Sequence, residues 1–93
     1  MRVYTAIFQL HLPSRSLKGK RSIVKSILAR ARSRFNVAAA EVDRQDEHGT
    51  AIIAFVTVAE NGLQARRLLE ELEAWLVEER PDVDVAAVEI EER

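Results

Sequence analysis

Residues 3–12, Val-Tyr-Thr-Ala-Ile-Phe-Gln-Leu-His-Leu, alternate between two faces and decide the start of the fold. Successive side chains of a strand point to opposite faces of a sheet. One face therefore carries only apolar residues: Ala6, Phe8, Leu10 and Leu12. The other carries Val3, Thr5, Ile7, Gln9 and His11. This alternation predicts a β-strand with its even-numbered face in the core.

After this strand, the spacing of the apolar residues changes from that of a strand to that of a helix. Pro13-Ser14-Arg15 interrupts the alternation, and Ser16 is a suitable N-cap for a helix that reaches about Phe35. The helix has an apolar stripe at helical spacing: Leu17, Val24, Ile27, Leu28, Ala31 and Phe35. Asn36 follows the helix, and residues 37–43 form an alanine-rich strand.

The second half repeats this order of elements. After a polar turn at 44–50, the branched residues of 51–59 predict a third strand. Asn61, with Gln64 three positions later, begins a second helix in the manner of a capping box, and Pro81 ends it. The second helix has four core leucines: Leu68, Leu69, Leu72 and Leu76. Residues 83–90 form the last strand.

The order β-α-β-β-α-β predicts an α+β fold, the ferredoxin-like sandwich, as a single domain over residues 1–93. Its four-stranded antiparallel sheet has the strand order 4-1-3-2, and both helices cover one face. Alternation within each strand places a set of apolar residues beneath the helices: Ala6, Phe8, Leu10, Ile52, Val56, Val58, Val88 and Ile90.

The opposite face is also apolar, which predicts an interface. Its expected members are Val3, Ile7, Val37, Ala39, Ile53, Phe55, Val83, Val85 and Ala87. We expect a homodimer that buries Ile7, Val37, Ile53, Phe55 and Val85. A covering by the chain's own termini is the alternative, but only Glu-Glu-Arg follows Ile90.

Charge divides the chain into two halves. Residues 1–40 contain nine Lys and Arg and no acid, whereas residues 41–93 contain all fifteen acids and five Arg. The halves thus carry +9 and 5 − 15 = −10 under a net charge of −1. Such asymmetry is typical of binding to nucleic acid or another anionic surface.

The first helix and the loop before it hold the candidate phosphate-binding residues: Arg15, Lys18, Lys20, Arg21, Lys25 and Arg32. At about 100° per residue, most of these fall on one flank, beside a ridge of small residues: Ser22, Ser26, Ala29 and Ser33. Arg30 and Arg34 fall towards the other flank. Pairing with the glutamates of the second helix is the alternative to a ligand, but that helix borders only one flank.

The loop at 13–21 leads into a helix N-terminus, where free N–H groups suit an anion. It is no Walker A loop, because Pro13 stands where the first glycine belongs and Arg21 where Ser or Thr belongs. A classical RNA-recognition sheet is also excluded, since Phe55 is the only aromatic residue expected on the open face.

A metal site or an acid–base pair was considered at His11, Glu41, Asp43, Asp46 and His48. Glu41 and Asp43 are expected on one face of an edge strand. His11 would lie two strands away from Glu41, roughly 10 Å, so protection of the edge is the better interpretation. We therefore expect no catalytic residue, no metal and no cofactor.

Cysteine is absent, no stretch resembles a signal peptide or a membrane span, and a cytoplasmic location is expected.

Several motifs resemble the YlxP-like family of small bacterial proteins. They are Ser16-Leu17-Lys18 with Lys20-Arg21, Val24-Lys25-Ser26, Arg34-Phe35-Asn36-Val37, and Ala40-Glu41-Val42-Asp43 with Gln45-Asp46. The chain departs from the family at Gly19, where Glu is common, and at Glu47-His48-Gly49. Genes of the family commonly lie beside genes for transcription antitermination, translation initiation and ribosome maturation. The resemblance implies a ferredoxin-like fold and an RNA or ribosome context.

The basic residues favour a non-enzymatic protein that presents a basic helix and loop to phosphates. The resemblance implies that the partner is RNA or the ribosome, with a role in ribosome maturation or translation. The alternative is a dimeric scaffold or a small-anion-sensing module without a nucleic-acid role.

Overall fold

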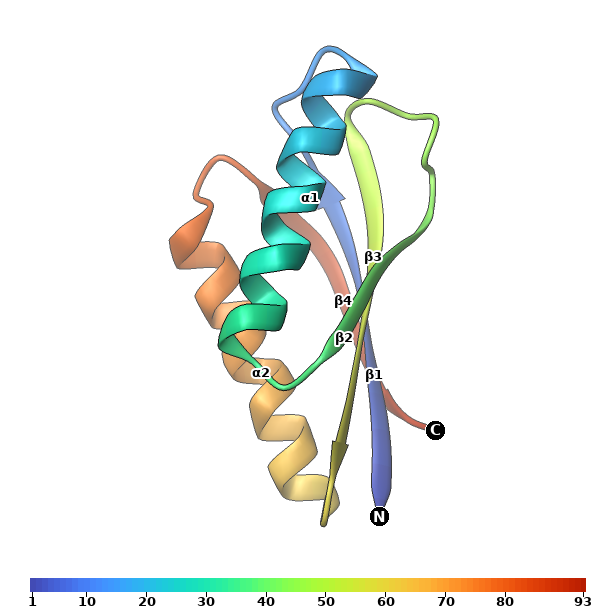
Figure 1. Cartoon of the computed structure of the whole chain (residues 1–93), viewed down its shortest axis with the longest axis vertical. Helices are drawn as coiled ribbons and strands as arrows, with labels where there is room; N and C mark the ends of the chain where they lie inside the picture. The colour runs from blue at the N-terminus through green and yellow to red at the C-terminus, as the bar shows by residue number, and fades with distance from the viewer.

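A computed structural model describes residues 1–93 as four strands and two helices, about 41 × 23 × 21 Å in extent (Figure 1). The elements follow the predicted order: β1 (Arg2–His11), α1 (Leu17–Arg34), β2 (Ala38–Asp43), β3 (Thr50–Ala59), α2 (Gly62–Glu79) and β4 (Asp84–Glu92). All neighbouring strands are antiparallel, and the sheet order is β2-β3-β1-β4. The predicted α+β, ferredoxin-like fold and its strand order are confirmed.

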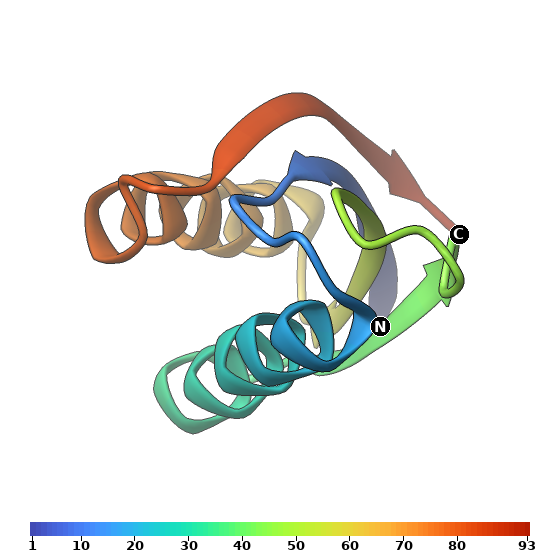
Figure 2. The same ribbon diagram turned by 90° about the horizontal axis from the view of Figure 1, so that it is seen from above.

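Both helices lie on the same side of the curved sheet, as seen from above in Figure 2. α1 packs against β2, while α2 packs against β1, β3 and β4. Neither helix combines the length and the apolar composition that crossing a bilayer would require.

Both helices begin at the predicted caps. The Ser16 hydroxyl accepts a hydrogen bond from the N–H of Gly19 at 3.0 Å, and the Asn61 side chain accepts one from the N–H of Gln64 at 2.8 Å. Each bond satisfies a donor that a helix N-terminus otherwise leaves free. Gly19 also permits tight packing, because a Cβ there would lie 2.9 Å from Ser14 Oγ.

β1 carries the centre of the core, with the face that its alternation predicts. Ala6, Phe8 and Leu10 are fully buried beneath the helices. The core leucines of α2 are buried as well, apart from Leu68, which is half-buried.

The face prediction for β3 was wrong. Ile53 and Phe55 are fully buried beneath the helices, whereas Ile52, Val56 and Val58 lie on the open face. Both faces of β3 are apolar, so alternation alone could not choose between them. The structure places Phe55 edge-on to Phe8, with ring centroids 5.1 Å apart.

Thr57 lies on the same face of β3 as Ile53 and Phe55. It is buried, and its hydroxyl donates to the carbonyl of Asn36 at 2.9 Å. Burying a hydroxyl group lowers the stability of the fold little when the group makes such a hydrogen bond.

An irregularity in the pairing of β1 with β4 accounts for the errors at the start of β4. Between β1 and β4, Gln9 pairs with Ala87 and Leu10 with Val85, so Ala86 is an extra residue. This bulge turns Val85 towards the helices, where it packs on the core beside Val88 and Ile90. The valine was expected on the open face. Val83, also expected on the open face, is buried with the core. Val37 and Ala39 pack on the core as well, and not on the open face as predicted, because Ala39 pairs with the buried Phe55.

The open face is nevertheless apolar, with different members. Its partly exposed residues on β1, β2 and β3 are Val3, Thr5, Ile7, Gln9, Ala38, Ala40, Ile52, Ala54, Val56 and Val58. Glu89 and Glu91 of β4, opposite Ile7 and Thr5, form an acidic border. No aromatic side chain belongs to this face, because Tyr4, Phe8 and Phe55 are all buried.

Because Phe55 faces the core and Val56 faces outward, truncating these neighbouring side chains to alanine should lower stability by unequal amounts. Phe55→Ala should lower the free energy of unfolding by about 4 kcal/mol, because it empties a fully buried site beside Phe8. Val56→Ala should cost less than about 1 kcal/mol, because Val56 is partly exposed. Urea unfolding of the two variants measures the difference, and equal costs would contradict the assignment of the faces.

Candidate nucleic-acid interface

The flank of α1 that faces β2 forms a shallow groove of about 190 Å³. Arg21, Lys25 and Arg32 line it together with Val24, Leu28 and Glu41. The three cations lie four and seven positions apart, so they share one side of the helix. Three of the predicted phosphate-binding residues are thus brought together, as the helical spacing indicated.

Lys20 does not belong to this surface, although it was predicted there. Its side chain is 1% exposed, and its ammonium lies 2.9 Å from the Glu41 carboxylate. The same ammonium donates a hydrogen bond to the carbonyl of Arg44. Lys20 occupies a position in the apolar stripe of α1, where a charged residue is buried only if it is paired.

Glu41 points towards Lys20 because it follows Ala39 by regular alternation on the face of β2 that lies beneath the helices. A second irregularity begins only after Glu41. Glu41 pairs with Ile53 and Asp43 with Ile52, so Val42 is the extra residue and the two acids point to opposite faces. The expectation that Glu41 and Asp43 share a face was therefore wrong. Glu41 Oε2 has no donor aligned for a hydrogen bond, so its contact with Lys20 is chiefly electrostatic.

The other predicted cations are exposed, and none makes an ion pair. The six ion pairs of the molecule join Arg2–Glu92, Lys20–Glu41, Arg30–Glu79, Arg44–Glu47, Arg80–Asp82 and Arg93–Glu91. Arg30 alone links α1 to α2, on the flank where such pairing was expected. Arg15, Lys18, Arg21, Lys25 and Arg32 have no carboxylate partner, although Arg32 donates to the carbonyl of Ala39 at 3.3 Å.

The ridge beside the groove consists of small residues. Ser22, Ala29 and Ser33 are exposed, and Ser26 is half-buried. The small side chains leave room for a phosphate backbone to approach α1 closely. The longer side chains of the groove cations can then reach its phosphates.

The loop before α1 is held in place from the β2–β3 turn; the two loops lie at the same end of the sheet (Figure 1). A ring nitrogen of His48, Nδ1, lies 2.9 Å from the Ser14 carbonyl, and the N–H of Leu12 donates to the Gly49 carbonyl at 2.9 Å. The amides of Leu17 and Lys18 make no hydrogen bond within the protein. Arg15 and Lys18 are exposed around this end of the helix.

The acids and histidines considered for a metal site are dispersed. Glu41 pairs with Lys20, Asp43 accepts from the N–H of Arg44, and His48 contacts Ser14. No group of three His, Asp or Glu side chains is close enough to hold a metal ion.

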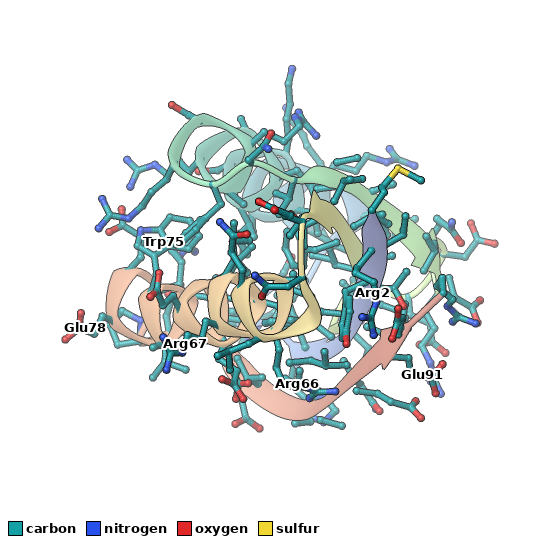
Figure 3. The ribbon with its side chains drawn as sticks, turned by 90° about the horizontal axis from the view of Figure 1, so that it is seen from below. Arg2, Arg66, Arg67, Trp75, Glu78 and Glu91 are labelled. Atoms are coloured by element: carbon teal, nitrogen blue, oxygen red, sulfur yellow. The ribbon has the colours of Figure 1, made fainter.

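At the opposite end of the sheet, an ion pair between Arg2 and Glu92 ties β1 to β4. The Arg2 guanidinium donates to Glu92, and this hydrogen bond holds the pKa of the Glu92 carboxyl below its usual range. Arg66 lies 5.8 Å from the Tyr4 ring. Figure 3 shows Arg2 beside the sheet, on the other side of the molecule from Trp75. Both cations lie on the β4 side of the sheet, whereas the groove on α1 lies beside β2, at the opposite edge.

Sequence reasoning missed a larger cleft, of about 740 Å³, at the end of α1. It is lined by the residues that close α1 and by the first turns of α2. Periodicity within single helices could not reveal it, because it arises from the offset between them.

A family model described as "Protein of unknown function (DUF503)" matches residues 3–90. No curated protein matches the chain.

Two lysines near the start of α1 should differ sharply in their contribution to stability. Lys20→Gln should lower the free energy of unfolding by about 2–4 kcal/mol, because it leaves the Glu41 carboxylate without its cation in a poorly hydrated position. Lys18→Gln, a matched change at an exposed and unpaired residue, should change it by less than about 0.5 kcal/mol. Thermal unfolding of both variants decides, and similar midpoints would show that Lys20 is not a structural residue.

Proposed function

We propose that this chain, which belongs to the DUF503 family, is a non-enzymatic RNA-binding protein that contacts phosphates through the groove of α1. One observation carries the proposal: Arg21, Lys25 and Arg32 gather at one groove without a carboxylate partner. Cations left unneutralised within a protein of net charge −1 favour an external anion.

A phosphodiester backbone fits this surface better than an isolated small anion does. The exposed cations extend from Arg15 and Lys18 at the loop to Arg32 in the last turn of α1, an 18-residue helix. At about 1.5 Å per residue such a helix is roughly 27 Å long, which several successive phosphates could span. The groove is too shallow to enclose a ligand, as expected for backbone contacts that do not read a sequence.

The resemblance of residues 16–46 to the YlxP-like family supports a ribosomal context. We propose on this basis that the RNA is ribosomal and that the protein acts in ribosome maturation or translation. Co-purification with ribosomal fractions, followed by identification of the bound RNA, tests that part of the proposal.

Neutralising three groove-side cations should nearly abolish RNA binding. Contact with about four phosphates of a single strand predicts a log–log salt slope near −3, and the variant K18Q/R21Q/K25Q should reduce the slope to about −1. Its matched control is R2Q/R66Q/R93Q, which removes the same charge from the other end of the molecule. Titration of each triple variant with single-stranded and structured RNA, at two salt concentrations, measures the affinity and its salt dependence.

Equal losses in the two triple variants, or no binding at low salt, would contradict this proposal. Tight binding of inorganic phosphate with little salt dependence would instead favour the small-anion alternative.

We propose in addition that the open face of the sheet pairs with the same face of a second copy. Ile7, Ala54 and Val56 lie at the centre of that face, between small alanines on β2 and the acidic border on β4. Two β4 borders placed over each other would repel, so the copies should meet with β4 of one above β2 of the other.

Val56→Glu should convert such a dimer to monomer, because it places an unpaired carboxylate inside the interface. Sedimentation of wild type and variant at high micromolar concentration provides the measurement. Lys18→Glu, on the helix side of the molecule, is the control and should stay dimeric. If the wild-type protein sediments as a monomer at that concentration, the proposed dimer is contradicted.

A further inference from the structure

The cleft at the end of α1 is distinct from the proposed RNA groove. α1 ends beside the middle of α2, and the first turns of α2 continue beyond it (Figure 1). Arg34, Phe35 and Asn36 form one wall, and α2 forms the other from Leu63 to Glu71. Its volume of about 740 Å³ lies within the range of about 300–1,000 Å³ that is typical of small-molecule sites.

The cleft is rich in unused hydrogen-bond donors. Arg34 stands on the α1 wall and Arg67 on the α2 wall, and neither makes an ion pair. Asn61 accepts a bond through its oxygen from the N–H of Gln64, which leaves its amide NH₂ free to donate. Two guanidiniums with free amide donors suit a phosphate group, because arginine can bind its oxygens in pairs.

The same cleft also offers apolar surface and one acceptor. Leu63 is 62% exposed at its edge, and Phe35 and Leu68 are partly buried within it. The Arg34 guanidinium lies 5.9 Å from the centre of the Phe35 ring. Glu71, one helical turn after Arg67, adds a carboxylate that can accept from hydroxyl groups.

We propose that this cleft binds a nucleotide: a phosphate between Arg34 and Arg67, ribose hydroxyls at Glu71, and the base against Leu63 and Phe35. A bare inorganic anion would leave the apolar wall unused and would meet the repulsion of Glu71. A free mononucleotide and the terminal nucleotide of an RNA present the same groups. The site does not depend on the groove between α1 and β2.

Trp75 is the only tryptophan and reports on the cleft. It lies between the two helices, and its ring is 5.6 Å from that of Phe35 (Figure 3). A ligand that packs on Phe35 should therefore change the fluorescence of Trp75.

The test titrates AMP, adenosine, inorganic phosphate and a short oligoadenylate against the whole chain, with Trp75 fluorescence and calorimetry as readouts. AMP should bind at least about tenfold more tightly than adenosine or phosphate, because it engages both kinds of wall. R34Q and R67Q should each weaken AMP binding about tenfold through loss of a charge-assisted hydrogen bond. R66Q is the matched control and should change nothing, because Arg66 lies over Tyr4 and on the β4 side of α2.

The triple variant K18Q/R21Q/K25Q should retain AMP binding, which separates this site from the proposed RNA groove. Oligoadenylate binding that is weakened by R34Q and R67Q, without binding of AMP, would support the cleft and identify RNA as the source of the nucleotide. If neither probe binds, or if R34Q and R67Q bind both probes like wild type, the proposal is overturned.

Discussion

The ammonium of Lys20, enclosed between α1 and the end of β2, fixes the geometry on which the basic surface depends. It meets the Glu41 carboxylate and the carbonyl of Arg44 at once. Arg44 is the only residue other than glycine with a positive φ, 59°, and its backbone turns the chain into the β2–β3 loop there. One side chain of α1 thus holds a strand end, a bulge and a loop. Removing either charged partner would leave the other buried alone.

This attachment determines which faces α1 can present. With Lys20 directed inward, Arg21 and Lys25 follow on the flank beside β2, and the small residues Ser22 and Ser26 come between that flank and the solvent side. The division of charge in the sequence becomes a division in space only because α1 is fixed in this rotation. The acids of α2 and β4 lie elsewhere, and Arg30–Glu79 is the one ion pair between the helices.

The helices and strands, their caps and the sheet order could be predicted from the sequence. They depend on the spacing of apolar residues and on turn residues, which are local signals. The sequence was insufficient for β3, where Ile52 and Ile53 are equally apolar and only the packing of Phe55 on Phe8 selects the face. It was also insufficient at the bulges, since one extra residue at Ala86 or Val42 reverses the faces of everything beyond it. Lys20 was assigned to the surface because its buried partner, Glu41, lies opposite Ile53, on the face of the sheet that the error at β3 had turned outward.

The central position of β1 has a consequence for the time at which the chain can fold. β1 pairs with β3 on one side and with β4 on the other, and Arg2 and Glu92 join residues 90 positions apart. Contacts this distant in sequence close late, because the entropy of the intervening chain must be lost first. During synthesis, one edge of the first strand therefore stays open until the last strand leaves the ribosome. Until then the unpaired N–H and C=O groups of that edge are open to misassembly with another strand.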